Sequence, residues 1–563
     1  MNIKKTLLPF LLVFFISTFC TGQTNQNYPD LKRFFKNLPF KMEALSVPVF
    51  PDRDINIKDF GAVEDGITMN TKAFQKAIDE CAKNGGGRVV VPAGMWLTGP
   101  IYFKDNVNLF LENGAFIQFS TNYDDYPLIE SNWEGMNQFR CTSPLMARNV
   151  KNIAITGNGI IDGGGQVWRP VKKYKLTEIQ WNELLSSGGV LDNRGTTWWP
   201  TAEARDALSH FASLRKENKT LTKEDAEKYK VFFRPVLLSF VQCKNVWLDG
   251  VTFQNSPAWN LHPLLCENVI LTNVNVRNPW FSQNGDGIDL ESCKNALLYN
   301  CKFDVGDDAM CMKSGKDKEG RDRGRPTENV VIQDCIVYHG HGGFTIGSEM
   351  SGGIKNIKID NCNFIGTDIG LRFKSTRGRG GIVENIHISN IFMKDIPTDA
   401  LSFNMYYGGF APTEDASAEE KSKAAQAVPV TEETPIFRNI FMNNIYCTGA
   451  KDAIVLQGLP EMPIAGIEIK NVIMTAQRGI SIYDADGIKI INSKISSSSP
   501  AVKVNQSSNV LIDNFTASAD NDTILKLDGD KTKNIIVKGT GAKEIKNKVQ
   551  FGNSVPQDAL KVE

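Results

Sequence analysis

The sequence predicts an all-β fold, a right-handed parallel β-helix in which short strands stack coil upon coil into a solenoid. From about residue 145 onward one phrase recurs: a polar residue, Asn, an apolar-x-apolar pair, a small polar step and a second such pair, as in KNVWLDGVTF from Lys244 and ENVILTNVNV from Glu267. The alternation within a copy is typical of strands, and the spacing between copies is typical of a solenoid. Neither of the two strands in a copy can bury its apolar face alone, so the coils must stack.

The copies align on one asparagine and on one small apolar position. The asparagines are Asn245, Asn268, Asn295, Asn329, Asn356 and Asn385. The apolar position holds Val251, Val274, Cys301, Cys335, Cys362 and Ile391. Because cysteine there replaces valine or isoleucine, the three cysteines are interpreted as small buried hydrophobes rather than disulfides or metal ligands, although an exported protein could pair its cysteines.

Composition limits the classes of partner. The chain has 563 residues and a formal net charge of zero, so nothing in its charge calls for nucleic acid. A polyanionic partner must instead meet a local basic patch. We expect a single β-helix domain over residues 45–550, because repeat folds grow by stacking. We also expect a monomer with no cofactor, no metal and no membrane-spanning segment.

The N-terminus predicts export. Lys4 and Lys5 precede an apolar run from Leu7 to Phe19 that is too short and wrongly flanked to span a membrane as a mature helix. Residues 1–22 are therefore interpreted as a signal peptide, and we expect a periplasmic or extracellular protein. Cys20 raises the alternative of a lipoprotein, which the bulky residue before it disfavours.

Three segments depart from the repeat. Residues 55–100 form an N-terminal cap, in which helical apolar spacing from Asn70 to Gly85 predicts a helix over the open end of the solenoid. Residues 164–235 form an insertion with four tryptophans, for which packing is favoured over a sugar-binding platform. Residues 412–434 are rich in Ala, Glu, Ser, Lys and Thr, and predict a mobile surface loop.

Four short motifs fall in successive coils. They are Asn284-Gly285-Asp286-Gly287, Gly306-Asp307-Asp308, Gly340-His341-Gly342-Gly343 and Arg372-Phe373-Lys374. Residues one coil apart lie about 4.8 Å from each other, so the four motifs should form one patch. Three carboxylates this close cannot all ionise freely, so the pKa of one should rise and keep a proton available. An acid beside a base is what hydrolysis of a glycosidic bond requires.

Cations near the acidic centre predict an acidic sugar. Arg372 and Lys374 alternate with Phe373, so both should point outward from a strand while Phe373 enters the core. An Arg side chain grips a carboxylate with two hydrogen bonds, and Lys adds a point charge. Further cations in the flanking loops complete a basic rim: Lys313, Lys316, Arg377 and Arg379.

At these motifs the sequence resembles the polygalacturonase family, glycoside hydrolase family 28, whose hallmarks are N-T-D, G/Q-D-D, G-H-G and R-I-K. Gly285 and Phe373 are mild departures that keep every functional side chain. FGAVEDG from Phe60 and IGSEMSGG from Ile346 also look like bacterial members, and the resemblance covers roughly residues 55–540.

The resemblance implies a role for each residue. Asp307 protonates the leaving oxygen, and Asp286 and Asp308 hold the attacking water. His341 tunes the acid through hydrogen bonding. The substrate, an acidic plant polysaccharide such as pectin, is bound by Asn284, Arg372, Lys374 and either Tyr406 or Tyr407. The family implies inversion, although carboxylates about 5 Å apart are typical of retaining enzymes.

Two other functions stay open. A pectate lyase shares the solenoid and the substrate but needs calcium, for which an aspartate cluster offers oxygen ligands; the GHG and RFK motifs argue against it. A non-catalytic polysaccharide-binding β-helix has no need of Asp307 and Asp308 beside His341. The choice between homogalacturonan and rhamnogalacturonan also stays open. The long insertion slightly favours action at chain ends, because extra structure can close a groove.

Overall fold

The computed structural model describes residues 29–217, 219–409, 426–518 and 520–563, with the isolated residues 417, 419 and 422. The predicted signal peptide lies outside these residues, as does much of the first half of the predicted loop at 412–434. Within the described part of the chain, no helix combines the length and the apolar character needed to cross a bilayer.

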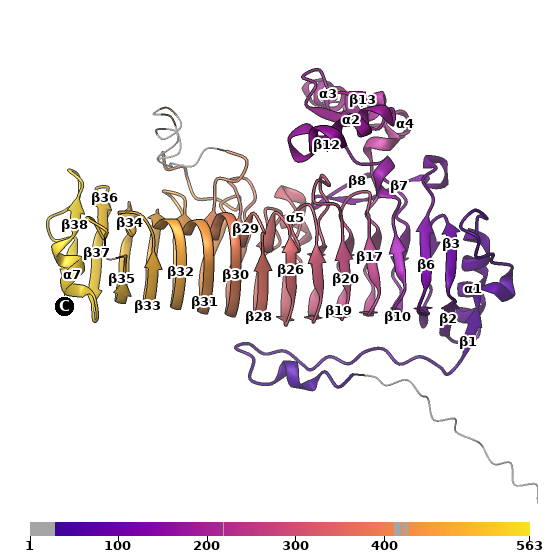
Figure 1. The fold of residues 1–563 in the computed structure, drawn as a ribbon, viewed down its shortest axis with the longest axis horizontal. Coiled ribbons are helices and arrows are strands. Elements are labelled where there is room, and N and C mark those ends of the chain that lie inside the picture. The colour runs from indigo at the N-terminus through magenta and orange to yellow at the C-terminus, as the bar shows by residue number, and fades with distance from the viewer. Residues whose placement is uncertain are drawn as a thin grey trace, which may run out of the picture.

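The chain forms a right-handed parallel β-helix, confirming the predicted fold, with its N-terminal end at the right of Figure 1. Its coils build three ladders of hydrogen-bonded parallel strands. The first ladder contains β1 (Asp54–Asn56), β2 (Gly87–Val91), β5 (Val107–Leu111), β10 (Lys151–Gly157), β16 (Lys244–Asp249), β19 (Glu267–Thr272), β22 (Lys294–Tyr299) and β25 (Thr327–Gln333). The second contains β3 (Gly94–Thr98), β6 (Ala115–Phe119), β11 (Ile160–Asp162), β17 (Thr252–Gln254), β20 (Asn275–Arg277), β23 (Lys302–Asp304) and β26 (Ile336–His339).

The third ladder was not predicted, because the sequence reading assigned two strands to each coil. It contains β4 (Ile101–Tyr102), β9 (Leu145–Arg148), β15 (Leu238–Val241), β18 (Leu261–Leu264), β21 (Ile288–Glu291), β24 (Met310–Lys313), β27 (Gly342–Ile346) and β29 (Ile369–Lys374). These strands have only two to six residues, and in β15, β18, β21 and β24 both faces are buried. Short strands with polar residues on a buried outer face lack the pattern that marks a strand in a sequence.

Later coils are continuous strands that turn the corners without a break. They are β28 (Ile354–Ile365), β30 (Ile382–Asn404), β31 (Ile436–Gln457), β32 (Ile464–Tyr483) and β33 (Ala485–Ser496). The last coils contain β34 (Val502–Asn505), β35 (Ser508–Thr516), β36 (Leu525–Asp528), β37 (Lys533–Lys538), α7 (Ala542–Asn547), β38 (Val549–Phe551) and β39 (Leu560–Val562).

The repeated asparagines form a ladder of their own. Each has a positive φ, between 57° and 61° for the six named above, a left-handed conformation that Asn tolerates better than most residues. Each side-chain amide donates to the amide oxygen of the preceding copy, for example Asn268 to Asn245 at 2.9 Å and Asn356 to Asn329 at 3.0 Å. One residue type thus supplies both the turn and a bond between coils.

The cysteines lie inside the solenoid as predicted. Cys301, Cys335 and Cys362 are fully buried free thiols in the predicted apolar position. A second stack follows another corner: the Cys243 amide donates to the Cys266 sulfur and the Cys266 amide to the Cys293 sulfur, each at 3.4 Å. In these positions sulfur fills core volume and accepts a weak hydrogen bond from the backbone.

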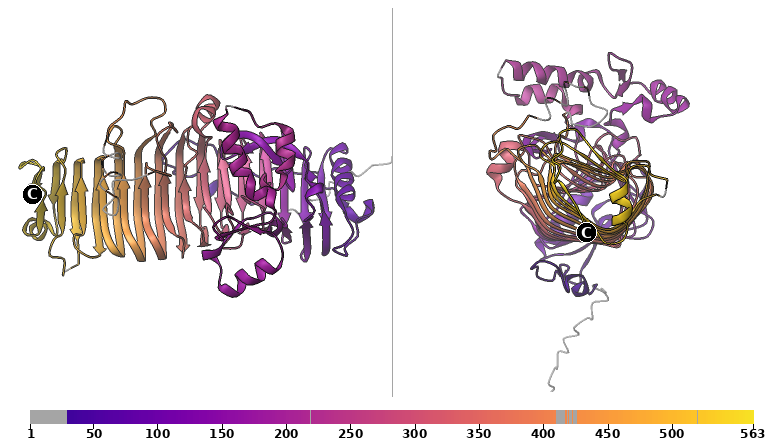
Figure 2. Two further views of the ribbon diagram at one scale, coloured as in Figure 1. Left: turned by 90° about the horizontal axis from the view of Figure 1, so that it is seen from above. Right: turned by 90° about the vertical axis from the view of Figure 1, so that its left-hand side faces the viewer.

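Segments outside the coils cover the N-terminal end and one side of the solenoid. Helix α1 (Thr71–Lys83) packs Phe74 and Ile78 onto the first coils, where the sequence predicts a helix. Residues 29–50 form an extended arm along the first ladder, on the side of the solenoid opposite the insertion (Figure 1; Figure 2, right). The apolar residues of the arm cover outward-facing apolar residues of five coils: Ala154, Trp247, Ile270, Leu297 and Val331.

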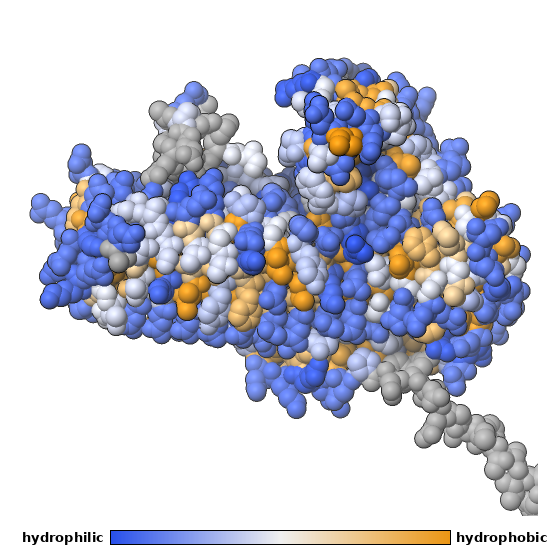
Figure 3. Space-filling model, viewed as in Figure 1, coloured by the Kyte–Doolittle hydropathy of each residue, from blue (hydrophilic) through white to orange (hydrophobic). Residues whose placement is uncertain are grey.

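The insertion stands on the other side of the solenoid, beside a hairpin of β7 (Leu128–Trp133) and β8 (Met136–Cys141). It contains β12 (Val171–Lys172), α2 (Glu178–Ser186), β13 (Val190–Leu191), β14 (Thr197–Trp199), α3 (Ala202–Lys216) and α4 (Lys223–Lys228). Trp168, Trp181 and Trp198 are at most 6 % exposed, so these three pack the insertion rather than offer a sugar platform. The outer surface of the insertion is largely hydrophilic (Figure 3).

Candidate active site

The four motifs meet on the third ladder. Asp286 precedes β21, Asp307 and Asp308 precede β24, and His341 precedes β27, so consecutive coils carry them to one place. One oxygen from each of the three aspartates lies within 4.8 Å of the others. The carboxylates border a cavity of about 480 Å³. The patch predicted from the repeat spacing therefore exists.

Asp308 is a buried carboxylate held between two cations. Its Oδ1 accepts a hydrogen bond from Arg372 Nη1 at 3.0 Å, and its Oδ2 accepts one from Lys374 Nζ at 2.7 Å. Burial would raise the pKa of Asp308, but Lys374 and Arg372 outweigh burial and lower this pKa below its ordinary value. Asp308 is therefore ionised throughout the neutral range.

The pKa of Asp286 is shifted in the opposite direction. Its side chain is buried, and its Oδ1 has no hydrogen-bond partner among the described residues. Burial, and then the charges of Asp289 and Asp307, raise the pKa of Asp286 well above its usual value. A raised pKa of one carboxyl in the cluster is what the sequence predicts, and here it is found at Asp286.

Asp307 is the most accessible of the three aspartates, and its side chain is partly exposed to the cavity. His341 was expected to bond the acid. Its Nδ1 instead pairs with Asp368 Oδ2 at 2.7 Å, and only its backbone amide reaches Asp307, donating to the carbonyl oxygen at 2.8 Å. Asp368 lies one coil further along and thereby fixes the orientation of the imidazole.

Arg372 and Lys374 face outward from β29, and Phe373 is buried in the core, as the alternation predicts. Both cations are nevertheless only 8 % and 6 % exposed, and both are already paired with Asp308. Lys374 borders the cavity, whereas Arg372 is absent from its described lining. The expectation of two free cations for a sugar carboxylate is therefore corrected: both cations are paired with Asp308, and of the two only Lys374 borders the cavity.

The other predicted substrate-binding residues differ in their access to the cavity. The Asn284 Oδ1 accepts from Arg234 Nη2 at 3.0 Å, and the amide borders the cavity. Tyr407 also borders the cavity, with the Lys374 Nζ 4.9 Å from its ring centre. Tyr406 is 6 % exposed and packs within the core. Of the two tyrosines, only Tyr407 can meet a ligand in this cavity.

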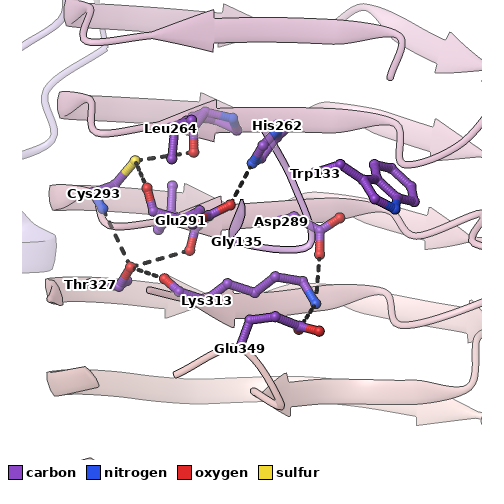
Figure 4. A network of polar contacts seen from close by, with 12 residues as sticks. Trp133, Gly135, His262, Leu264, Asp289, Glu291, Cys293, Lys313, Thr327 and Glu349 are labelled. Carbon is purple, nitrogen blue, oxygen red and sulfur yellow. Dashed lines mark hydrogen bonds and ion pairs between the residues drawn. The ribbon is translucent and has the colours of Figure 1, made fainter. Parts of the chain in front are cut away.

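Sequence reasoning missed a buried charge network beside the aspartates (Figure 4). The Lys313 Nζ lies 2.7 Å from Glu349 Oε2, 3.6 Å from Asp289 Oδ1 and 4.9 Å from the Trp259 ring centre. Lys313 lies within β24. The prediction that it lies in a flanking loop is therefore wrong. Burial would raise the pKa of Glu349, but Lys313 and Lys374 hold it at about 2.

The rest of the predicted basic rim is neutralised by ion pairs. Lys316 pairs with Glu134 at 3.6 Å, and Arg377 forms two hydrogen bonds to Glu461 at 2.6 and 2.8 Å. Arg379 pairs with Asp317. Of the four predicted rim cations only Lys313 borders the cavity. Lys374 borders it as well, and the insertion adds Lys172 and Lys175.

A hairpin that borders the cavity through Glu134 is bridged to a neighbouring helix. The hairpin tip between β7 and β8 meets α5 (Asp317–Arg323), a helix that follows β24. The Glu319 side chain accepts from the Asn137 amide at 2.9 Å, and Arg323 Nη2 donates to the Gly135 carbonyl at 3.1 Å. Below the bridge Trp133 stacks on Trp259, with ring centres 4.4 Å apart. The hairpin is thus fastened on both sides of its tip.

Two family models match parts of this chain. The model of glycosyl hydrolases family 28 matches residues 172–477, and one described as rhamnogalacturonase A/epimerase, pectate lyase-like, matches residues 54–193. A probable polygalacturonase of Vitis vinifera is 30 % identical over 77 % of this chain and 76 % of its own length. An exo-poly-alpha-D-galacturonosidase of Dickeya chrysanthemi is 29 % identical over 63 % of this chain, and 57 % of its length is matched.

Solved structures agree as well. An exopolygalacturonase from Thermotoga maritima superposes with a TM-score of 0.67 at 30 % identity, covering 80 % of this chain and 93 % of that one. A family 28 exopolygalacturonase from Yersinia enterocolitica gives 0.61 at 22 % identity, covering 91 % of this chain and 79 % of that one, and supports the fold alone. The family model spans more than half of the chain and includes all four motifs. This chain belongs to glycosyl hydrolases family 28.

Proposed function

We propose that this chain hydrolyses α-galacturonosyl linkages of pectin from the ends of chains, by acid–base catalysis with inversion. One observation carries the proposal: a carboxylate kept ionised by two cations, Asp308, lies within 4.8 Å of two carboxyls that repel each other, Asp286 and Asp307. Such a cluster holds an acid and a base together near neutral pH. The named activities of the relatives fit this chemistry.

In the proposed mechanism Asp286 and Asp307 share a single proton, because like charges this close cannot both ionise. Asp307 faces the cavity and delivers this proton to the leaving glycosidic oxygen. Asp286, then ionised, and Asp308 hold a water on the opposite side and accept its proton. His341, whose imidazole is oriented by Asp368, borders the same cavity and contacts the bound substrate there.

The sugar carboxylate is assigned to the side of the cavity where Lys374 and Tyr407 lie. After pairing with Asp308, Lys374 still has N–H donors for a second acceptor, because an ammonium has three of them. Lys172 and Lys175 supply further positive charge from the insertion. Asn284, whose oxygen is occupied by Arg234, presents its amide donors to sugar oxygens.

Action at chain ends is supported by the hairpin, which borders the cavity through Glu134 and is fastened at its tip to α5. A chain that meets this wall can place only its terminal residues beyond the scissile bond. Export to the periplasm or the cell exterior, where pectin is met, fits the predicted signal peptide.

A calcium-dependent lyase is the weaker alternative. Both oxygens of Asp308 already accept hydrogen bonds from cations, which leaves few ligands for calcium, an ion that takes six to eight oxygens. A pure binding module gives no reason to keep an unpartnered Asp286 beside Asp307.

The test is product analysis on polygalacturonate. Wild-type protein should release one short product from the chain end, β-configured at first when followed by NMR, and activity should persist in chelator. Asp307→Asn should lower turnover at least about 10²-fold without a change in folding. An unsaturated product, or retention of a tenth of the turnover by the variant, would overturn the proposal.

A further inference from the structure

A short turn of the insertion borders the catalytic cavity. This 3₁₀ turn, Lys173–Lys175, directly follows β12, and Lys172, Tyr174 and Lys175 belong to the lining of the cavity. Lys173, in the same turn, is exposed and is absent from the described lining. The insertion therefore adds two cations to a cavity whose aspartates all come from the coils.

The tryptophan core of the insertion fixes the position of this turn. Val171, which precedes the turn, is buried, and Leu176, which follows it, packs against the same cluster around Trp181 and Trp198. Phe281, from the loop before β21, also packs on this cluster and joins the insertion to the solenoid. Because the residues on both sides of the turn are anchored, its lysines extend toward the cavity from a fixed backbone.

Most of the charged groups around the cavity already have a partner. Six carboxyls and four lysines border it. Ion pairs join Lys374 to Asp308, Lys313 to Glu349 and Lys316 to Glu134, and His341 contacts Asp368. Among the described residues, the charged groups of the lining without a partner of opposite charge are Asp286, Asp307, Lys172 and Lys175. The two carboxyls are the proposed proton-sharing pair, which leaves the two lysines for an anionic ligand.

Of these two lysines, Lys175 lies beside the proposed acid. Its Nζ donates to the carbonyl oxygen of Gly306 at 3.5 Å, and Gly306 directly precedes Asp307. Burial lowers the pKa of Lys175, and the negative charge of Asp307 opposes this shift. After its bond to Gly306, the ammonium still has two N–H donors for a ligand in the cavity.

We propose that Lys175 is a substrate-binding residue, which holds the carboxylate of the sugar that leaves when the bond is cut. Asp307 delivers its proton to the leaving oxygen, so a cation anchored on the residue before Asp307 faces the leaving sugar. The contact is a charge-assisted hydrogen bond, formed by an ammonium that has no other counter-charge. This inference rests on the proposed function and makes the insertion a part of the active site.

The kinetic test uses two substrates, digalacturonate and its analogue in which only the reducing-end sugar is methyl-esterified. Lys175→Met keeps the length of the side chain and removes its charge. Relative to wild type, it should lower kcat/KM roughly ten- to a hundredfold on digalacturonate and less than about threefold on the ester. Lys173→Met is the matched control, because it makes the same change in the same turn outside the cavity lining; it should alter neither rate. Equal losses on both substrates, or no loss on digalacturonate, would overturn the assignment.

A binding measurement separates this inference from the proposed function. In the Asp307→Asn background, calorimetry should show that Lys175→Met raises the Kd for digalacturonate at least about fivefold and leaves the Kd for the ester unchanged. If wild type cuts neither substrate but this difference in Kd is found, the proposed reaction fails while the contact stands. If digalacturonate is hydrolysed and neither its rate nor its Kd depends on Lys175, the contact fails while the reaction stands.

Discussion

The ammonium of Lys374 lies 2.7 Å from the Oδ2 of Asp308, although 66 residues separate them along the chain. Arg372, two residues earlier on β29, holds the other oxygen at 3.0 Å. The two cations thus share one partner but differ in access, because only Lys374 borders the catalytic cavity. Because of this difference, substitution of each cation can distinguish their roles.

Arg372→Ala and Lys374→Ala should respond differently to methyl esterification of the substrate. Both remove a partner of Asp308, so both should lower kcat/KM, by roughly ten- to a thousandfold. The loss in Lys374→Ala should shrink on an esterified substrate, because the carboxylate that it contacts is gone. The loss in Arg372→Ala should be the same on both substrates. Initial rates at matched esterification measure this, and identical behaviour of the two variants would contradict the assignment.

Asp308→Asn should destabilise the protein at neutral pH. Removing the charge leaves two buried cations without their counter-charge, a loss of about 3–5 kcal/mol by analogy with other broken buried pairs. Because the folded-state pKa of Asp308 is lowered, its contribution is present above the unfolded value of 3.8 and is lost as the pH falls toward the folded pKa. The stability difference between wild type and variant, followed by denaturant unfolding, should therefore narrow below pH 4.

Asp286→Asn should have the opposite effect and stabilise the protein at neutral pH. A raised pKa means that the folded state binds more protons than the unfolded chain between 3.8 and the raised value, so the wild type loses stability as pH rises through that window. The variant lacks this loss and should be the more stable protein at neutral pH, while its turnover collapses. Unfolding curves at pH 4 and pH 8 test this, with Asp308→Asn as the matched comparison. A variant less stable than wild type at pH 8 would show that Asp286 is ionised and well solvated.

Cys335→Val should leave the melting temperature within about 3 °C of wild type, since the side chain is a buried apolar filler in a position that also takes valine and isoleucine. Reductant should have equally little effect on the wild type. A large fall in melting temperature on reduction would show that the stack of thiols is cross-linked.

Tyr407→Phe and Tyr406→Phe form another matched pair. Tyr407 borders the cavity, so loss of its hydroxyl should raise KM several-fold, as one lost hydrogen bond of about 1 kcal/mol predicts. Tyr406 lies in the core, so its variant should change stability and leave KM unaltered. Thermal unfolding and steady-state kinetics on oligogalacturonides separate the two effects.

The repeat made the solenoid predictable because each copy carries both a left-handed asparagine and an inward apolar stripe. The same spacing located the aspartates, since coil geometry alone brings Asp286 and Asp307 together. The side-chain partners of these residues could not be predicted from the sequence. That Lys374 reaches Asp308 two coils away, and that His341 turns to Asp368 one coil away, depends on register and side-chain direction. Lys313 was misplaced because its strand is short and its outward face is covered by a hairpin from residues 128–141.

The arm at residues 29–50 imposes an order on folding. It leaves the ribosome before any coil exists, yet its apolar residues pack on positions as distant as Val331. Closing so long a loop costs entropy that only the finished surface can repay, and contacts of large sequence separation form slowly. The arm therefore docks last, after about half the chain has wound. Until then Trp247 and Ile270 are bare, and a nascent or partly unfolded molecule offers that apolar strip to chaperones or to another chain.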